Sequence, residues 1–140
     1  MQSVNFEELL EPILAKDPRY HREAYLFLRE SLDHTQKIVS KPKKGEIRHV
    51  SGQELLAGIR EYALEQFGPM ALTVLEEWGI KSCEDFGEIV FNMVEHGLLA
   101  KTDKDSREDF KTGYDFYEAF RRPFLPAAQP TASPSMPKKS

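Results

Sequence analysis

Asp103, Asp105 and Asp109 have the spacing with which carboxylates begin a calcium-binding loop. Such a loop needs a glycine at its sixth position for the sharp turn and a bidentate glutamate at its twelfth. Glu108 holds the sixth position and Tyr114 the twelfth, so neither requirement is met. The spacing therefore does not predict a calcium site.

The histidines and the single cysteine do not form a metal or catalytic motif either. No two of His21, His34, His49 and His96 stand four residues apart, and no HExxH motif is present. Cys83 is expected to be a small apolar residue near a helix start, because one cysteine excludes a disulfide framework and a multi-cysteine metal site. Glycine-rich phosphate loops and GxSxG motifs are absent. We therefore predict a protein that is not an enzyme and that binds no metal, cofactor or small-molecule ligand.

The composition is that of an ordinary globular protein. The chain has 140 residues, of which 40% are hydrophobic and 30% charged, and its formal net charge is -4. This length fits one domain, and the mild acidity gives no bulk attraction to nucleic acid or anionic lipid. The sequence shows no leader-like segment, and no run approaches the roughly 18 apolar residues of a membrane helix. Together with the cysteine content, this favours a cytoplasmic protein.

The first forty residues predict two helices. Apolar residues recur at helical spacing over 6–14, although Pro12 removes one backbone donor, so we expect a helix that is short, kinked or broken. Asp17 followed by Pro18 is typical of a helix start. The apolar pattern that follows predicts a long helix over 18–39.

Residues 46–112 predict a core of helices and short strands. Capping boxes at Ser51 and Ser82 begin two amphipathic helices, which end near Phe67 and Gly97, and a further helix lies between them. Short alternating patterns predict strands over 46–50, 98–102 and 107–112, the last two joined as a β-hairpin.

The order strand, three helices and hairpin resembles a winged helix. The predicted fold class is therefore mainly α (α+β), with a winged-helix-like core over 46–112 preceded by the N-terminal helices. One globular domain is expected over 1–124. A tail over 125–140, rich in Pro, Ala, Ser and Lys, is expected to be disordered. The winged-helix resemblance implies nucleic-acid binding through the last helix of the core.

The charges of that last helix argue against nucleic acid. Between Glu84 and His96 the chain carries four acidic residues and no lysine or arginine, which is the wrong charge for contact with phosphates. A winged-helix shape used for protein contacts fits better, because fold alone does not decide function.

Aromatic residues are dense from Phe110 to Phe124. One interpretation is a last short helix over 115–121 that folds these rings onto the N-terminal helices. The other is an aromatic docking segment beside two arginines, since these residue types are enriched at interface hot spots. The leading prediction is thus a protein-protein interaction module with an unidentified partner, a second copy of the chain among the candidates. Its partner-binding candidates are Glu84, Glu88, Glu95, Phe116, Phe120, Arg121 and Arg122.

A second function stays open because basic residues gather elsewhere. Lysines and one arginine crowd the segment 41–48, with only Glu46 opposing them, and more basic residues flank the expected hairpin turn. They predict a nucleic-acid-associated regulator whose binding weakens as salt rises, with a solvated loop as the plain alternative. The residues concerned are Lys41, Lys43, Lys44, Arg48, Lys101, Lys104 and Arg107.

Three short segments carry a resemblance to a known family. The segments 17–20 (DPRY), 49–55 (HVSGQEL) and 105–110 (DSREDF) together resemble an uncharacterised family of small bacterial proteins of planctomycete and verrucomicrobial type. The resemblance covers residues 2–124. It implies a bacterial cytosolic protein and supplies no activity, cofactor or site residue.

Overall fold

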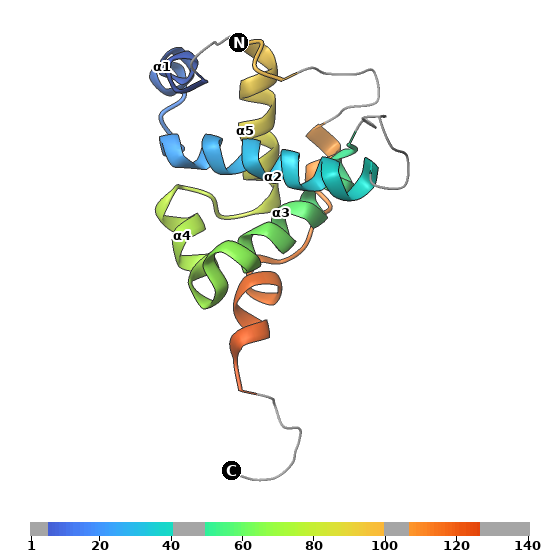
Figure 1. Ribbon diagram of the computed structural model, residues 1–140. Helices are drawn as coiled ribbons and strands as arrows, with labels where there is room; N and C mark the ends of the chain where they lie inside the picture. Colours follow the sequence, from blue (N-terminus) through green and yellow to red (C-terminus); the bar gives the residue numbers. More distant parts are fainter. Residues whose placement is uncertain (1–5, 41–49, 100–106, 127–140) are drawn as a thin grey trace.

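The computed structural model describes residues 6–40, 50–99 and 107–126, and this part of the chain consists of helices and their connections, without a strand (Figure 1). The longer helices are α1 (Phe6–Lys16), α2 (Arg22–Ser40), α3 (Gly52–Phe67), α4 (Ala71–Glu77) and α5 (Cys83–Glu95). The shorter turns are η1 (Gly68–Met70), η2 (Arg107–Phe110), the π-helical η3 (Tyr117–Arg121) and η4 (Arg122–Phe124).

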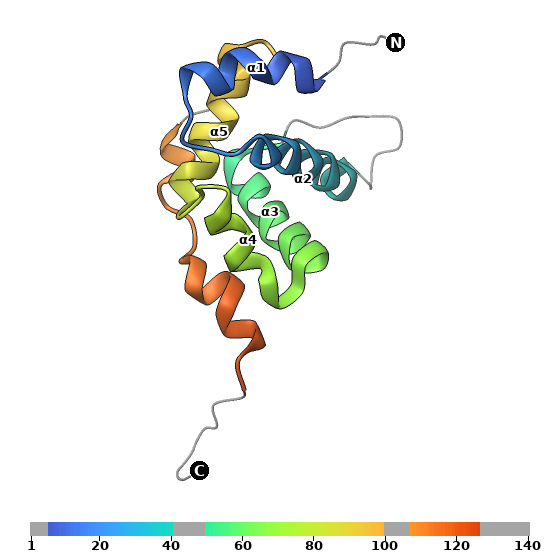
Figure 2. The ribbon, with the colours of Figure 1, turned by 90° about the vertical axis from the view of Figure 1, so that its left-hand side faces the viewer.

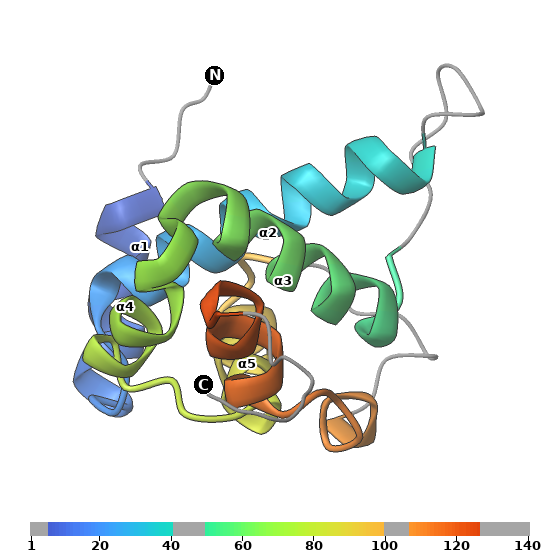
Figure 3. The same ribbon diagram turned by 90° about the horizontal axis from the view of Figure 1, so that it is seen from below.

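Helix α2 lies across α5 and packs against α3 (Figure 1). Seen from the side, α1 and α2 form the upper part of the molecule, with α3 and α4 beneath them (Figure 2). The C-terminal turns η3 and η4 sit beneath the bundle, with η3 against α3 and α4 (Figure 3). One continuous hydrophobic core joins these elements, and its fully buried side chains include Leu10, Ile13, Tyr25, Leu28, Ile59, Leu75, Phe86, Ile89 and Phe120.

The two capping boxes begin their helices as predicted. Ser51 Oγ accepts a hydrogen bond from the Glu54 amide at 3.1 Å, and Glu54 accepts one from the Ser51 amide at 3.0 Å. Asp85 plays the same part for Ser82, accepting from its amide at 3.2 Å. These bonds satisfy amides that the first helical turn leaves without a partner.

The N-terminal helices differ from the prediction in their bounds. Helix α1 continues through Pro12, and α2 begins at Arg22, later than the predicted start at Pro18. Asp17 does not cap α2. His21 does so instead, because its Nδ1 accepts a hydrogen bond from the Glu23 amide at 3.0 Å.

The predicted winged-helix-like core is wrong, since the described residues contain no strand for it. The supposed second hairpin strand, 107–112, begins instead with the 3-10 helix η2. Phe110 is buried, whereas Glu108 and Thr112 are exposed, so alternate residues do not share the buried face that a strand would need. The other two strands were expected over 46–50 and 98–102. Of these residues the structure describes only Val50, Leu98 and Leu99, which are not in a strand.

The expected tail lies mostly outside the described residues, which end at Pro126. Within the described ranges, no helix has the length and apolar character needed to cross a membrane.

Candidate functional site

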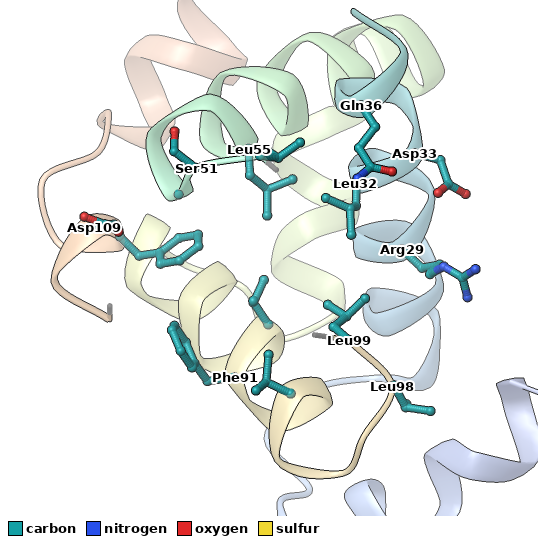
Figure 4. Close-up of a pocket in the computed structure, with 15 residues that line it drawn as sticks. Arg29, Leu32, Asp33, Gln36, Ser51, Leu55, Phe91, Leu98, Leu99 and Asp109 are labelled. Carbon is teal, nitrogen blue, oxygen red and sulfur yellow. The ribbon is translucent and has the colours of Figure 1, made fainter. Parts of the chain in front are cut away.

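A hollow of about 350 Å³ opens between α2, α3, α5 and η2 (Figure 4). Its apolar lining includes side chains that are already buried, such as Leu55, Phe91 and Phe110. Other apolar lining residues remain only half-buried: Leu32, Val90, Val94, Leu98 and Leu99. The hollow therefore offers incompletely covered apolar surface that a bound group would remove from water.

Two glycines bring η2 close enough to form one wall of this hollow. A β-carbon at Gly52 would stand 2.6 Å from the Asp109 β-carbon, and one at Gly87 would stand 2.8 Å from the Phe110 β-carbon. Gln53 fixes the same contact, because its Nε2 donates to the Asp109 carbonyl oxygen at 2.6 Å. These contacts hold η2 against α3 and α5.

The rim of the hollow is polar and carries charges of both signs. Arg29 and Asp33 come from α2, and Asp109 lies on the opposite side (Figure 4). The Arg29 guanidinium lies over the Phe6 ring, 5.3 Å from its centroid, in a cation–π contact. Gln36 adds an amide that can donate and accept hydrogen bonds. Such a rim can orient a bound group while the apolar lining holds it.

The acidic residues proposed on α5 do not line this hollow. Glu84 and Glu88 border a separate depression of about 250 Å³, together with Arg19 and Lys111. Glu88 lies 3.3 Å from the Arg19 guanidinium, so its charge is partly balanced. Glu95, near the end of α5, is exposed.

A polar network ties the connection between α1 and α2 to α5. Arg19 donates two hydrogen bonds to the Asp17 carboxylate, at 2.8 and 2.6 Å, and Asn92 Nδ2 donates to it at 3.0 Å. The same Asn92 nitrogen donates to the Tyr25 hydroxyl at 3.0 Å. The Arg19 guanidinium, more than any other group, holds the pKa of Asp17 well below its usual range. Nearby, burial and a hydrogen bond to Asp85 raise the pKa of Tyr20.

The aromatic candidates of the C-terminal segment are buried. Phe116 is 7% exposed and Phe120 is fully buried, with their ring centroids 5.1 Å apart. Tyr114 donates from its hydroxyl to the Leu56 carbonyl oxygen at 2.7 Å, and burial raises its pKa. The core interpretation placed these rings on the N-terminal helices. The segment packs mainly on α3 and α4, and Phe116 also contacts Phe86 of α5, with the ring centroids 5.4 Å apart.

The two arginine candidates beside these rings are exposed. Arg122 forms an ion pair with Glu118 at 2.9 Å, one helical turn away. The exposed aromatic side chains of this segment are Tyr117 and Phe124. An interface here would therefore use these two rings and the arginines, since Phe116 and Phe120 are already packed.

Cys83 is a buried free thiol at the start of α5. Its Sγ donates to the Tyr114 carbonyl oxygen at 3.5 Å, and burial raises its pKa to about 11. A thiol so protonated is a poor nucleophile. Among the described residues, no three His, Cys, Asp or Glu side chains are placed to share a metal ion.

Most nucleic-acid candidates lie outside the described residues, namely Lys41, Lys43, Lys44, Arg48, Lys101 and Lys104. Arg107 begins η2. The two segments that carry these residues join the described chain next to the hollow, at Val50 and Leu99, which line it.

Sequence reasoning missed the hollow altogether. Val90 and Val94 read as core positions of an amphipathic helix, and Leu98 and Leu99 read as part of a strand. The available signal was the pair of leucines directly after Gly97. The helix has ended at this glycine, yet the apolar residues of its buried face continue beyond it. Comparison of the chain with family models, with curated proteins and with solved structures gives no match.

Proposed function

We propose that this protein is a non-enzymatic protein-interaction module that receives apolar side chains of a partner protein in the hollow between α2, α3, α5 and η2. The observation that carries the proposal is the group of half-buried apolar residues gathered in one concave site, among them Leu32, Val94 and Leu98. The family resemblance implies a bacterial cytosol as its setting.

The size and lining of the hollow fit this role. A volume of about 350 Å³ is at the small end of protein pockets, which suits one or a few side chains of a partner. Each Å² of apolar surface that a partner covers contributes about 25 cal/mol before the costs of association. Gln36 and Ser51 on the rim supply polar groups that can meet the backbone of the bound segment.

The test compares partner capture by the wild-type chain and by a hollow variant. We expect chemical cross-linking in a lysate of the source organism to trap a partner on the wild-type protein and to lose it with Val94→Asp, which puts a charge among the apolar lining. Thr73→Asp is the matched control, because it adds the same charge at an exposed residue of α4 outside the hollow. Circular dichroism and the unfolding midpoint check that both variants fold.

Two results would count against the proposal. One is equal capture by the wild type and Val94→Asp, which would place the contact elsewhere. The other is a set of nuclear Overhauser contacts, in the isolated protein, between the Val94 or Leu98 methyl groups and a side chain of this same chain from 41–49 or 100–106. The hollow would then be an internal contact.

A nucleic-acid-associated regulator is the second candidate function. It is favoured by the fact that both basic segments, 41–48 and 101–107, are tethered at the same rim, next to Val50 and Leu99. Fluorescence anisotropy of labelled duplex DNA and structured RNA tests it. Binding that weakens steeply with salt and is lost in Lys43→Glu/Lys44→Glu would support this function, and no binding at low salt would end it.

A further inference from the structure

A second surface lies on a different face of α2 from the hollow, where α2 meets α3. Tyr62 of α3 donates from its hydroxyl to Glu30 Oε1 at 3.1 Å, and its ring centroid lies 5.2 Å from that of His34. His34 Nε2 lies 3.0 Å from Glu61 Oε1. We name this surface the acidic aromatic face and define it by Glu30, His34, Glu61, Tyr62 and Glu65.

The face is built on packed aromatic rings. Phe27 lies beneath it with its ring centroid 5.6 Å from that of Tyr62, and it is only 3% exposed. Phe67 and Trp78 extend the same cluster, each with a centroid within 5.6 Å of the Phe27 centroid. Tyr62 and His34 remain half-buried on top of this cluster. Their rings are therefore held in place and still open to solvent, which is typical of an interface anchor.

The charges around Tyr62 are negative. Burial, Glu30, Glu65 and Asp33 all raise the pKa of the Tyr62 hydroxyl. Glu30, Asp33, Glu61 and Glu65 are all exposed.

Two neighbouring arginines interact with other parts of the fold. The charge of Arg60 lowers the pKa of Tyr114, whose hydroxyl lies on a different side of α3. Arg29 lies over the Phe6 ring. Lys37, in the last turn of α2, is the nearest basic residue along that helix after His34. A bound group that complements the face should be cationic and flat enough to lie on a ring.

We propose that the acidic aromatic face binds an arginine-bearing segment of a partner protein, with the guanidinium over the Tyr62 ring and within reach of the Glu30 and Glu61 carboxylates. A guanidinium stacks on aromatic rings and also bonds carboxylates in a forked geometry, so it uses both features of the face. This surface and the hollow lie on different faces of α2, so the proposal goes beyond the apolar contact proposed above.

The test uses two synthetic peptides that differ in one group. Both are short and carry two arginine positions among serine and glycine; in the second peptide each arginine is replaced by citrulline, which keeps the shape and removes the charge. Each is titrated into the full-length protein while NMR follows the ring signals of Tyr62 and His34. We expect the arginine peptide to shift these signals saturably and the citrulline peptide to bind at least about tenfold more weakly.

Variants assign the effect to the named groups. Glu30→Gln/Glu61→Gln should weaken the arginine peptide about fivefold to tenfold, and Glu76→Gln, an exposed carboxylate on α4, should leave its affinity unchanged. Tyr62→Leu should weaken binding, whereas Tyr62→Phe, which keeps the ring, should restore most of it.

Three results would overturn the proposal. The first is equal binding of the arginine and citrulline peptides. The second is a response confined to the Val94 and Leu98 methyl groups of the hollow, with none at Tyr62. The third is a shift of the Tyr62 and His34 signals with protein concentration alone, because a second copy of the chain would then occupy the face.

Discussion

Gly58 of α3 packs directly against Thr35 of α2, so closely that a β-carbon at position 58 would stand 1.8 Å from the Thr35 hydroxyl oxygen. Thr35 is itself buried and donates from this hydroxyl to the Ser31 carbonyl oxygen at 2.8 Å. The crossing of the two helices therefore depends on the absence of a side chain at position 58.

Gly58→Ala should destabilise the protein, although alanine favours a helix more than glycine does by about 1 kcal/mol. Overpacking at a closed contact costs about 1–3 kcal/mol, and a contact as short as this one belongs at the upper end of that range. We therefore expect the net free energy of unfolding to fall by up to about 2 kcal/mol. Urea unfolding measures it. Thr35→Ala removes the hydroxyl in the way, so the double variant should lose less stability than the two single losses added together. Strict additivity would show that the two residues do not touch.

Phe120→Ala and Phe124→Ala should differ sharply. Phe120 is fully buried and Phe124 is 42% exposed, although both belong to the C-terminal segment. We expect Phe120→Ala to lower the free energy of unfolding by about 3–5 kcal/mol. Phe124→Ala should change it by about 0.5 kcal/mol or less. Equal, small effects would mean that the segment is only loosely attached to the bundle.

Asp17→Asn should cost stability in a pH-dependent way. Arg19 and Asn92 hold the folded pKa of Asp17 below its ordinary value of 3.8. A carboxyl with a lowered folded pKa contributes stability above its unfolded pKa, and this contribution fades as pH falls toward the folded value. We expect the variant to be about 1 kcal/mol less stable at pH 7, with a smaller difference at pH 3.

Thermal unfolding of wild type and Asp17→Asn across pH 2–8 provides this measurement, with Glu84→Gln as a surface control. A difference between wild type and Asp17→Asn that grows on acidification would contradict the role given to Arg19.

Gly113→Ala should open the contact over Cys83. A β-carbon at Gly113 would stand 2.5 Å from the Cys83 Sγ, so the segment that follows must move outward. We expect thiol labelling at pH 8 to be slow in the wild type, because the thiol is buried and its pKa is raised to about 11. Labelling should be at least about tenfold faster in the variant. Mass spectrometry follows the labelling. An equal labelling rate in the wild type and the variant would show that the contact with Gly113 does not control access to Cys83.

The helices of this protein were largely predictable because their signals are local. Ser51 with Glu54 and Ser82 with Asp85 mark helix starts within one turn, and the structure has α3 and α5 begin directly after these serines. Gly97, expected to end the last of these helices, has a positive φ of 77°, a conformation that glycine adopts without strain.

The hairpin prediction failed because its evidence was short and not specific to strands. An apolar residue between polar ones, such as Phe110, fits a strand or a single helical turn equally well. The choice between them depends on Gly87 and Phe91, which lie in another helix and accept the Phe110 ring. The capping role given to Asp17 failed because its carboxylate accepts the Arg19 amide in a turn that precedes α2, and Asn92, 75 residues away, donates to the same carboxylate.

The candidate site was less predictable than the fold. Its apolar lining comes from three helices, η2 and the connections at Val50, Leu98 and Leu99. No local sequence pattern indicates that these surfaces meet and stay partly uncovered. The acidic aromatic face illustrates the same point, since Tyr62 and Glu30 are 32 residues apart along the chain.

The long reach of the Asp17 and Tyr20 contacts also bears on how the chain folds as it is synthesised. Their partners Asn92 and Asp85 lie 75 and 65 residues further along. On a ribosome adding about 5–20 residues per second, the connection between α1 and α2 therefore waits several seconds for α5. Helices α2 and α3 can pair during that interval, so their crossing at Gly58 and Thr35 is positioned to form first. The polar network can close only once Asn92 of α5 has been synthesised.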